Sequence, residues 1–409
     1  MRSLAHIRAT ISEETHTPYR FVIAGLVLAS NLSLGLNSVA VSPLLPVIIE
    51  DYEIARTTAS LLTALPVLLR AFVALPGSLI VDRLGLKRVF ALSWFMMGAL
   101  ALSPLAQSYS ILLLLRLSYG VGASLTLLST GPLIMQWFRS KEMPVMNSLV
   151  MVSMSLGMAV SVSAAAPLAG AVAWRSVLGI FGAVALMGAV AWVFLGETQS
   201  ESHDGKPPLV LRDIWHVFRD PTIYLLVVGD ALVFIQYAAL TSWLPTYFHE
   251  FRGMSLAQAG YVTGLLPFVG MFAVLLGGLL TIRVKEKRFL FIIAGIMVGL
   301  GGFGSFLIGN TTLIYLSVIL LGFGTYVYQP VLLTVPMELP WMTPSKIAVV
   351  WASSLTIAGI GSFIAPVVVG ASRDVLGTFV PGFLVWALGA WALVAAGVLL
   401  PRLGTEGAP

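Results

Sequence analysis

The chain has 409 residues, of which 58% are apolar and only 10% are charged, and its mean hydropathy is +0.95. Soluble domains carry about 25% charged residues, so this composition excludes a soluble globular protein and requires apolar surface that faces lipid. The chain contains no cysteine, which excludes disulfides, thiol catalysis and cysteine-bound metal.

Twelve apolar runs are long enough to cross a bilayer as helices, since a hydrocarbon core of about 30 Å needs roughly 20 helical residues. They are continuously apolar rather than alternating, which favours helices over barrel strands. The sequence therefore predicts an all-α integral membrane protein with twelve transmembrane helices. In chain order, the runs lie near residues 21–49, 57–80, 89–107, 109–135, 146–170, 175–195, 221–247, 257–282, 289–309, 312–334, 346–371 and 379–401.

Lysine and arginine are distributed unequally between alternate connections. With the N-terminus placed in the cytoplasm, 17 of the 23 basic residues fall on the cytoplasmic side and four on the outer side, while Arg70 and Arg116 lie within spans. Cytoplasmic loops are enriched in Lys and Arg. We therefore predict a plasma (inner) membrane protein with both termini in the cytoplasm. The net charge of +5 is explained by this topology, and no nucleic acid is expected as a partner.

The longest polar stretch, residues 197–220, divides the chain nearly in half. It predicts an N-terminal six-helix bundle at 1–196, a cytoplasmic linker at 197–220 and a C-terminal six-helix bundle at 221–409.

The two halves also repeat each other at an offset of about 200 residues. Gly120-Val-Gly122 matches Gly322-Phe-Gly324, and Pro46 matches Pro245. The pair Pro167 and Gly170 likewise matches the pair Pro366 and Gly370. Duplicated helical halves place a substrate site between them near the membrane midplane, and one half rocks against the other.

The connection between the second and third runs contains the motif Gly77-x4-Asp82-Arg83-x-Gly85-x-Lys87-Arg88. Gly77 permits close helix approach, Gly85 permits a tight turn, and the basic cluster lies on the predicted cytoplasmic side. With this motif and the repeat, the chain resembles the major facilitator superfamily. The resemblance implies that the motif (Gly77, Asp82, Arg83, Gly85, Lys87 and Arg88) controls conformation.

Shorter similarities refine this resemblance. Trp243-Leu-Pro-Thr-Tyr247 and Glu338-Leu-Pro-x-Met-Thr-Pro344 are similar to anion:cation symporters and cyanate permease-like carriers. Arg116-x3-Gly120-x-Gly122 resembles the family's arginine-bearing motif, which makes Arg116 a proton-linked or conformational residue, with a purely structural role as the alternative.

Two further ionisable residues lie deep in the spans, where charge is costly and functional roles are expected. The guanidinium of Arg70 near the midplane suits an anionic substrate, although it could instead be a structural residue. Asp230 is the one acid well inside a span. A carboxyl group in a low-dielectric site can carry a proton, so Asp230 is the candidate for proton coupling. Its alternatives are an ion pair with Arg70 across the halves and a neutral acid that is hydrogen-bonded to the backbone.

Polar and aromatic residues at interior positions complete the candidate substrate site. Each could instead hydrogen-bond between helices or pack in the core. Besides Arg70, they are Asn31, Asn37, Gln236, Tyr237, Tyr326, Tyr328 and Gln329.

The leading interpretation is a secondary active transporter that takes up a small organic or inorganic anion with protons, by rocker-switch alternating access. The alternative is a proton-coupled exporter of drugs or lipophilic cations, with Asp230 as the cation site, and a sensor of the same fold would bind ligand without flux. The resemblance disfavours nitrate, because nitrate carriers place a substrate arginine in each half and 257–282 contains none.

An enzyme is not expected, because the spans offer no interior histidine, cysteine or carboxylate pair, and the chain has no phosphate loop. No metal and no cofactor are predicted. The expected partners are the small-molecule substrate, a proton and the lipid bilayer, and the protein is expected to be a monomer.

Overall fold

The computed structural model describes residues 18–139, 141–199, 220–284, 286–338, 342 and 344–400, and these residues form helices joined by short turns. In the first half the elements are α2 (Arg20–Ser38), η1 (Ser42–Leu44), α3 (Leu45–Tyr52), α4 (Arg56–Leu84), α5 (Leu86–Gly98), η2 (Ala99–Leu105), α6 (Tyr109–Trp137), α7 (Met143–Ala171) and α8 (Trp174–Leu195).

The second half follows the same order of long helices. Its elements are α10 (Pro221–Arg252), α11 (Leu256–Arg283), α12 (Arg288–Leu307), α13 (Thr311–Val327), α14 (Gln329–Thr334), η3 (Val335–Glu338), α15 (Pro344–Leu376), α16 (Val380–Gly389) and α17 (Ala392–Leu399).

The predicted all-helical membrane fold is confirmed. Within the described residues, eleven helical segments are long and apolar enough to cross a membrane. The remaining predicted run, 57–80, lies within α4, a helix of 29 residues. Some predicted spans are divided into shorter helices. One division, between α13 and α14, falls just before Pro330, because proline lacks the N–H group that continues a helix.

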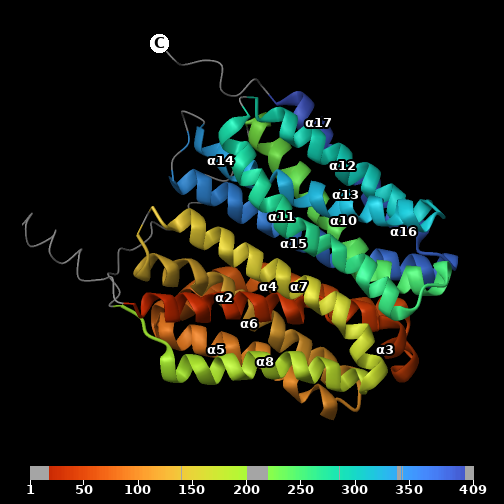
Figure 1. The fold of residues 1–409 in the computed structure, drawn as a ribbon, viewed down its shortest axis with the longest axis horizontal. Helices are drawn as coiled ribbons and strands as arrows, with labels where there is room; N and C mark the ends of the chain where they lie inside the picture. Colours follow the sequence, from red (N-terminus) through yellow and green to blue (C-terminus); the bar gives the residue numbers. More distant parts are fainter. Residues whose placement is uncertain are drawn as a thin grey trace, which may run out of the picture.

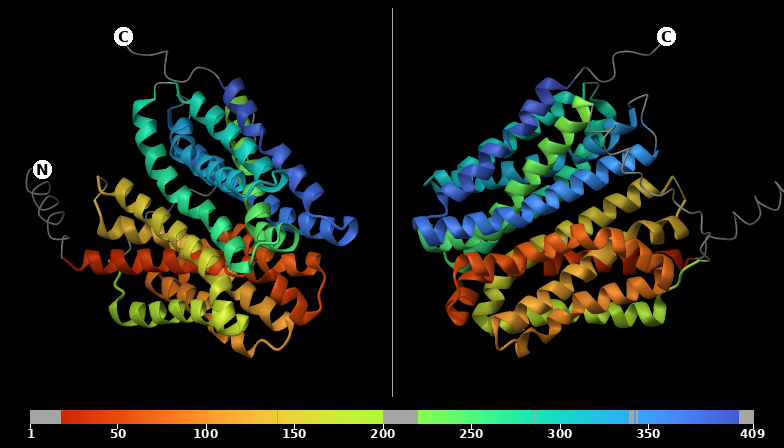
Figure 2. Two further views of the ribbon diagram at one scale, coloured as in Figure 1. Left: turned by 45° about the vertical axis from the view of Figure 1, so that its right-hand side comes forward. Right: turned by 180° about the vertical axis from the view of Figure 1, so that it is seen from behind.

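The helices form two groups that Figure 1 separates by colour, with α2–α8 from red to yellow-green and α10–α17 from green to blue. The two views in Figure 2 show the same separation. Between the groups, α4 packs along α15 and α7 packs along α11. Most of the predicted linker, residues 200–219, lies outside the described residues.

The internal repeat is visible in the helix packing. A Cβ on Gly120 of α6 would lie 2.8 Å from Cα of Pro66 in α4, and a Cβ on Gly322 of α13 would lie 2.9 Å from Cα of Leu266 in α11. These glycines therefore permit equivalent close helix contacts in the two halves. The matched residues are about 200 positions apart on both sides of each contact.

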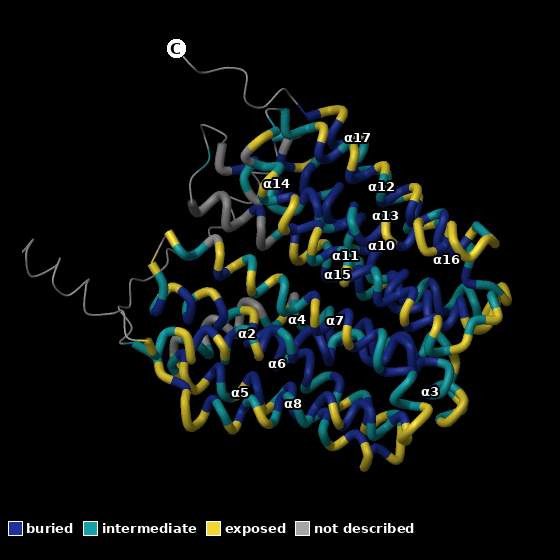
Figure 3. Tube along the Cα trace, in the orientation of Figure 1, coloured by how far each residue is buried: buried dark blue, intermediate teal, exposed yellow. Residues whose placement is uncertain are grey.

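Apolar side chains cover the outside of the helix groups. Phe194 and Val375 are each 80% exposed, while Asn31, Arg116 and Gln236 are fully buried. Figure 3 shows exposed segments along the outer faces and buried segments between the helices. This arrangement is what a lipid environment requires, because the polar groups that the chain contains must find partners inside the protein.

Candidate functional site

The carboxylate of Asp230 is the centre of a buried hydrogen-bond cluster in the second half. It is 5% exposed on α10. Tyr328 Oη and Gln329 Nε2 each donate to Asp230 Oδ1 at 2.8 Å, and Ser354 Oγ donates to Oδ2 at 2.9 Å. Tyr328 and Gln329 sit where α13 gives way to α14, and Ser354 lies on α15, so three helical segments meet at one acid.

This cluster can hold the carboxyl group in either protonation state. Three donors satisfy the charged form without a counter-ion. The hydroxyls of Tyr328 and Ser354 can also rotate and accept a hydrogen bond from the protonated form. Among the described residues, no contact joins Asp230 to Arg70, and its partners are side chains rather than the backbone groups considered above.

Arg70 lies at the middle of α4, 14 residues after Arg56 and 14 before Leu84, which is about 21 Å from either end at 1.5 Å per residue. Its Nε atom is buried and has no hydrogen-bond partner. Within the described part of the chain, no ion pair or hydrogen bond reaches its guanidinium. It lies within electrostatic range of a second cation, Arg116. Because two neighbouring positive charges repel each other, an anion between or beside them would be stabilised.

Arg116 has a different environment, because each of its three guanidinium nitrogens donates a hydrogen bond to a backbone carbonyl. Nε donates to the carbonyl of Leu62 at 2.8 Å, Nη1 to Asn37 at 2.6 Å and Nη2 to Ser38 at 3.0 Å. Two of these carbonyls belong to the last residues of α2, whose C-terminal carbonyls have no partners within the helix. The arrangement thus favours the structural alternative for Arg116 over the predicted proton-linked role.

We expect Arg116→Met to lower the free energy of unfolding by about 3 kcal/mol or more, because it leaves buried carbonyls without donors. Thermal unfolding in detergent measures this loss. Arg175→Met is the matched control. Arg175 also donates to a carbonyl, that of Ala106, and pairs with Asp51, but its side chain is 24% exposed. If Arg116→Met unfolds like the wild type but does not transport, the proton-linked role is favoured instead.

The two predicted asparagines connect helices within the first half. Asn31 Nδ2 donates to Thr130 Oγ1 of α6 at 3.1 Å, and Asn37 Nδ2 donates to the carbonyl of Phe181 in α8 at 3.1 Å. Their Oδ1 atoms are buried without partners. The NH₂ groups of both side chains therefore hydrogen-bond between helices, and only the Oδ1 atoms have no partner in the protein.

Gln236 and Tyr237 are adjacent on α10, and both amide atoms of Gln236 are buried without a hydrogen-bond partner. The buried Tyr237 hydroxyl has no partner at hydrogen-bond distance, but it lies close enough to the Tyr326 side chain to interact with it. The Gln236 amide lies against Gly302 of α12. The rings of Tyr237 and Tyr326 pack edge-on with their centroids 5.6 Å apart, and the rings of Tyr326 and Phe234 pack edge-on with centroids 6.4 Å apart. Buried polar groups are nearly always hydrogen-bonded, so these atoms are candidates for contact with a polar ligand.

The structure divides the predicted site residues into groups. Tyr328 and Gln329 bind Asp230, and Tyr237 and Tyr326 form an aromatic cluster. Ser354 was absent from the predicted site, although it completes the Asp230 cluster. A hydroxyl inside an apolar helix was its only sequence signal, and this signal is shared by many residues that bond only to their own helix, such as Ser317.

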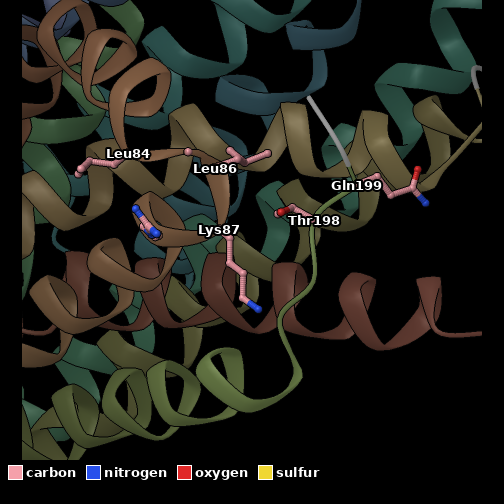
Figure 4. A pocket seen from close by; sticks show the side chains of 7 residues that line it. Leu84, Leu86, Lys87, Thr198 and Gln199 are labelled. Atoms are coloured by element: carbon pink, nitrogen blue, oxygen red, sulfur yellow. The ribbon is translucent and has the colours of Figure 1, made fainter. Parts of the chain in front are cut away.

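The predicted conformational motif forms the turn between α4 and α5. Gly85 has φ +78°, a conformation that favours glycine, and Arg83, Lys87 and Arg88 are exposed. Gly77 and Asp82 lie towards the end of α4, and the structure does not describe the surroundings of Gly77 or the side chain of Asp82. A hollow of about 330 Å³ lies beside the turn, lined by Leu84 to Arg88 with Thr198 and Gln199, and Figure 4 shows these side chains.

Comparison with known proteins agrees with this architecture. A "Probable nitrate transporter NarT" of Staphylococcus carnosus is 26% identical over 264 residues, covering 63% of this chain and 67% of the relative. A "Nitrite extrusion protein" of Bacillus subtilis is 24% identical over 359 residues, covering 85% and 86%. A solved bacterial homologue of the human lysosomal transporter Spinster superposes with a TM-score of 0.72 at 19% identity, covering 93% of this chain and 95% of that chain.

The fold and its buried charges define a multi-pass integral membrane transporter built from repeated helical halves. The chain belongs to the Major Facilitator Superfamily, whose sequence profile matches residues 27–366. The family resemblance of the sequence is therefore confirmed. The protein is a secondary transporter of a small molecule and not an enzyme.

Proposed function

We propose that this transporter takes up a small anion together with protons by rocker-switch alternating access. One observation supports the anion above the others: Arg70 lies at the middle of α4 with a buried Nε that has no partner. A charged group deep in a membrane protein normally pairs with another group. The guanidinium of Arg70 is therefore free to bind an anionic substrate. Its planar donors suit a carboxylate or an oxyanion.

Two relatives bear the names of transporters of inorganic anions, nitrate and nitrite, which supports an anion for this chain. Nitrate itself is not our first candidate. The only arginine of α11 is Arg283 at its end, so the second interior guanidinium that the family resemblance associates with nitrate is missing. We propose a small carboxylate or cyanate first. The unpaired atoms of Asn31, Asn37, Gln236 and Tyr237 would then contact its polar groups.

Proton coupling is assigned to Asp230, because its cluster accommodates the carboxyl group with or without a proton. Tyr328 and Gln329 would act through this acid rather than on the substrate, and Tyr326 would line the substrate path. In this proposal the anion site lies between the halves, with Arg70 on the first and Gln236 and Tyr237 on the second, and the proton site lies on the second half. Movement of one half against the other would then connect the two sites.

The remaining features of the proposal follow from the sequence. We propose a monomer in the plasma membrane with both termini in the cytoplasm, and two bundles, 1–196 and 221–409, joined by the linker at 197–220. The motif from Gly77 to Arg88 would then lie at the cytoplasmic end, where its basic residues satisfy the positive-inside rule.

Uptake into proteoliposomes with an inward proton gradient tests the function. The panel contains nitrate, cyanate and small mono- and dicarboxylates, and protein-free liposomes are the control. We expect one class of anion to accumulate and to leak out again when the gradient is collapsed. If no anion moves but a lipophilic cation is expelled, the exporter alternative replaces this proposal. Ligand binding without any flux would indicate a sensor.

A further inference from the structure

The end of the molecule that carries the start of α4 is bridged by contacts between the two halves. The residues involved are Arg56 and Thr57 of α4, Glu250 of α10, and Arg373 and Asp374 of α15, which we name the outer latch. We propose that Asp374 holds this end closed by capping α4 from the opposite half. The inference rests on the alternating-access part of the proposed function and is independent of the substrate.

The N-terminus of α4 has no cap of its own. Its N-cap residue is Ala55, which forms no capping hydrogen bond, so the first backbone N–H groups need another acceptor. Asp374 provides it. Its Oδ1 accepts from the backbone N of Arg56 at 3.2 Å, and its Oδ2 accepts from the backbone N of Thr57 at 2.8 Å and from Thr57 Oγ1 at 2.7 Å.

The helix dipoles explain why this contact favours the closed end. Asp374 lies in the last turn of α15 (Pro344–Leu376), where the partial negative charge of its own helix disfavours a carboxylate. The positive end of α4 compensates for that cost, but only while the two halves touch. When the end opens, α4 loses its cap and Asp374 returns to an unfavourable position.

A second acid strengthens the same bridge. Glu250 accepts from Arg56 Nη2 at 2.8 Å and from Arg373 Nε at 3.3 Å. Arg56 is therefore bound through its backbone to α15 and through its side chain to α10. The two cations and two anions balance, so no net charge accumulates when the latch closes. The side chains of Arg56 and Arg373 are each 26% exposed and Asp374 is exposed, so solvent weakens both the ion pairs and the cap.

The backbones also meet at this point. A Cβ on Gly370 of α15 would lie 2.9 Å from the carbonyl oxygen of Arg56. Beside the contact is a hollow of about 470 Å³ that is lined from both halves, with Glu50 and His249 among its residues. Glu50 forms none of the latch bonds although it faces the same hollow. It therefore offers a control for the loss of one negative charge at this end.

Spin-label distance measurements on the purified, substrate-free transporter test the latch, and the cysteine-free sequence makes labelling simple. One pair, Gln107→Cys with Thr312→Cys, reports on the latch end across the two halves. A second pair, Lys141→Cys with Arg283→Cys, reports on the opposite end. All four positions are exposed.

We expect Asp374→Ala to raise the ratio of molecules with an open latch end to molecules with a closed one by about tenfold. The distance distribution of the first pair should then gain a longer component, and that of the second pair a shorter one. Thr57→Val, which removes one of the three bonds, should shift both pairs less in the same direction. If Asp374→Ala does not fold, the distances measured in Thr57→Val test the latch instead. Glu50→Ala should leave both distributions unchanged.

Unchanged distances in Asp374→Ala would overturn the inference. So would a longer first distance without a shorter second one, since that result describes local fraying of α4. An equal shift in Glu50→Ala would assign the effect to net charge. Because these distances are measured without substrate, the latch can fail while anion uptake is confirmed, and the reverse also holds.

Discussion

Replacing Arg70 with methionine is expected to reduce anion uptake by about 100-fold or more while raising the midpoint of thermal unfolding. Arg70 is half-buried, and loss of one partner from a desolvated pair of charges costs roughly 2–5 kcal/mol, which accounts for the loss of uptake once the anion is bound. The stability gain has a separate cause. The buried Nε has no partner, so a neutral side chain of similar length removes a desolvation cost of about 1 kcal/mol.

The opposite directions of these two effects distinguish a binding residue from a structural one. A structural arginine would lose stability on this substitution, as we expect for Arg116→Met, which serves as the matched control. Arg70→Lys retains the charge without the planar donors and should retain weak uptake. Uptake of the anion panel and unfolding in detergent are measured on the same preparations. A lower unfolding midpoint in Arg70→Met would contradict the binding role.

Asp230→Asn is expected to abolish proton-driven accumulation while leaving exchange of labelled for unlabelled substrate. Asparagine has nearly the same shape and can still accept from some of the three donors, but it cannot carry the proton. The measurement pairs substrate accumulation with proton influx, followed by a pH-sensitive dye inside the liposomes. Loss of one donor should weaken coupling only partly, so Tyr328→Phe and Ser354→Ala are expected to lie between the wild type and Asp230→Asn.

Two outcomes would contradict the coupling role of Asp230. Undiminished accumulation in Asp230→Asn would place the coupling proton elsewhere. Loss of exchange together with accumulation would show that the acid serves substrate binding or folding instead. An unchanged unfolding midpoint separates the latter two, because a folding role for a buried group with three partners predicts a large loss of stability.

The need to cross a bilayer constrains the amino-acid sequence directly, so the sequence alone was sufficient to predict the membrane-spanning helices. Continuous apolar runs, the side preference of Lys and Arg, and an offset of about 200 residues between glycines such as Gly120 and Gly322 depend only on local composition and spacing. The same rule identified Arg70 and Asp230, because an ionisable residue inside an apolar run stands out without reference to its partners.

The hydrogen-bond partners of the buried and bridging polar residues could be identified only from the tertiary structure. In a membrane protein the lipid-facing and protein-facing sides of a helix are both apolar, so periodicity does not reveal how a helix is rotated. The carbonyls of α2 that Arg116 binds, the three donors of Asp230 and the 318-residue separation between Arg56 and Asp374 all depend on that rotation. Hydrogen bonds form only at short range and in one orientation, and packing of the two halves supplies both.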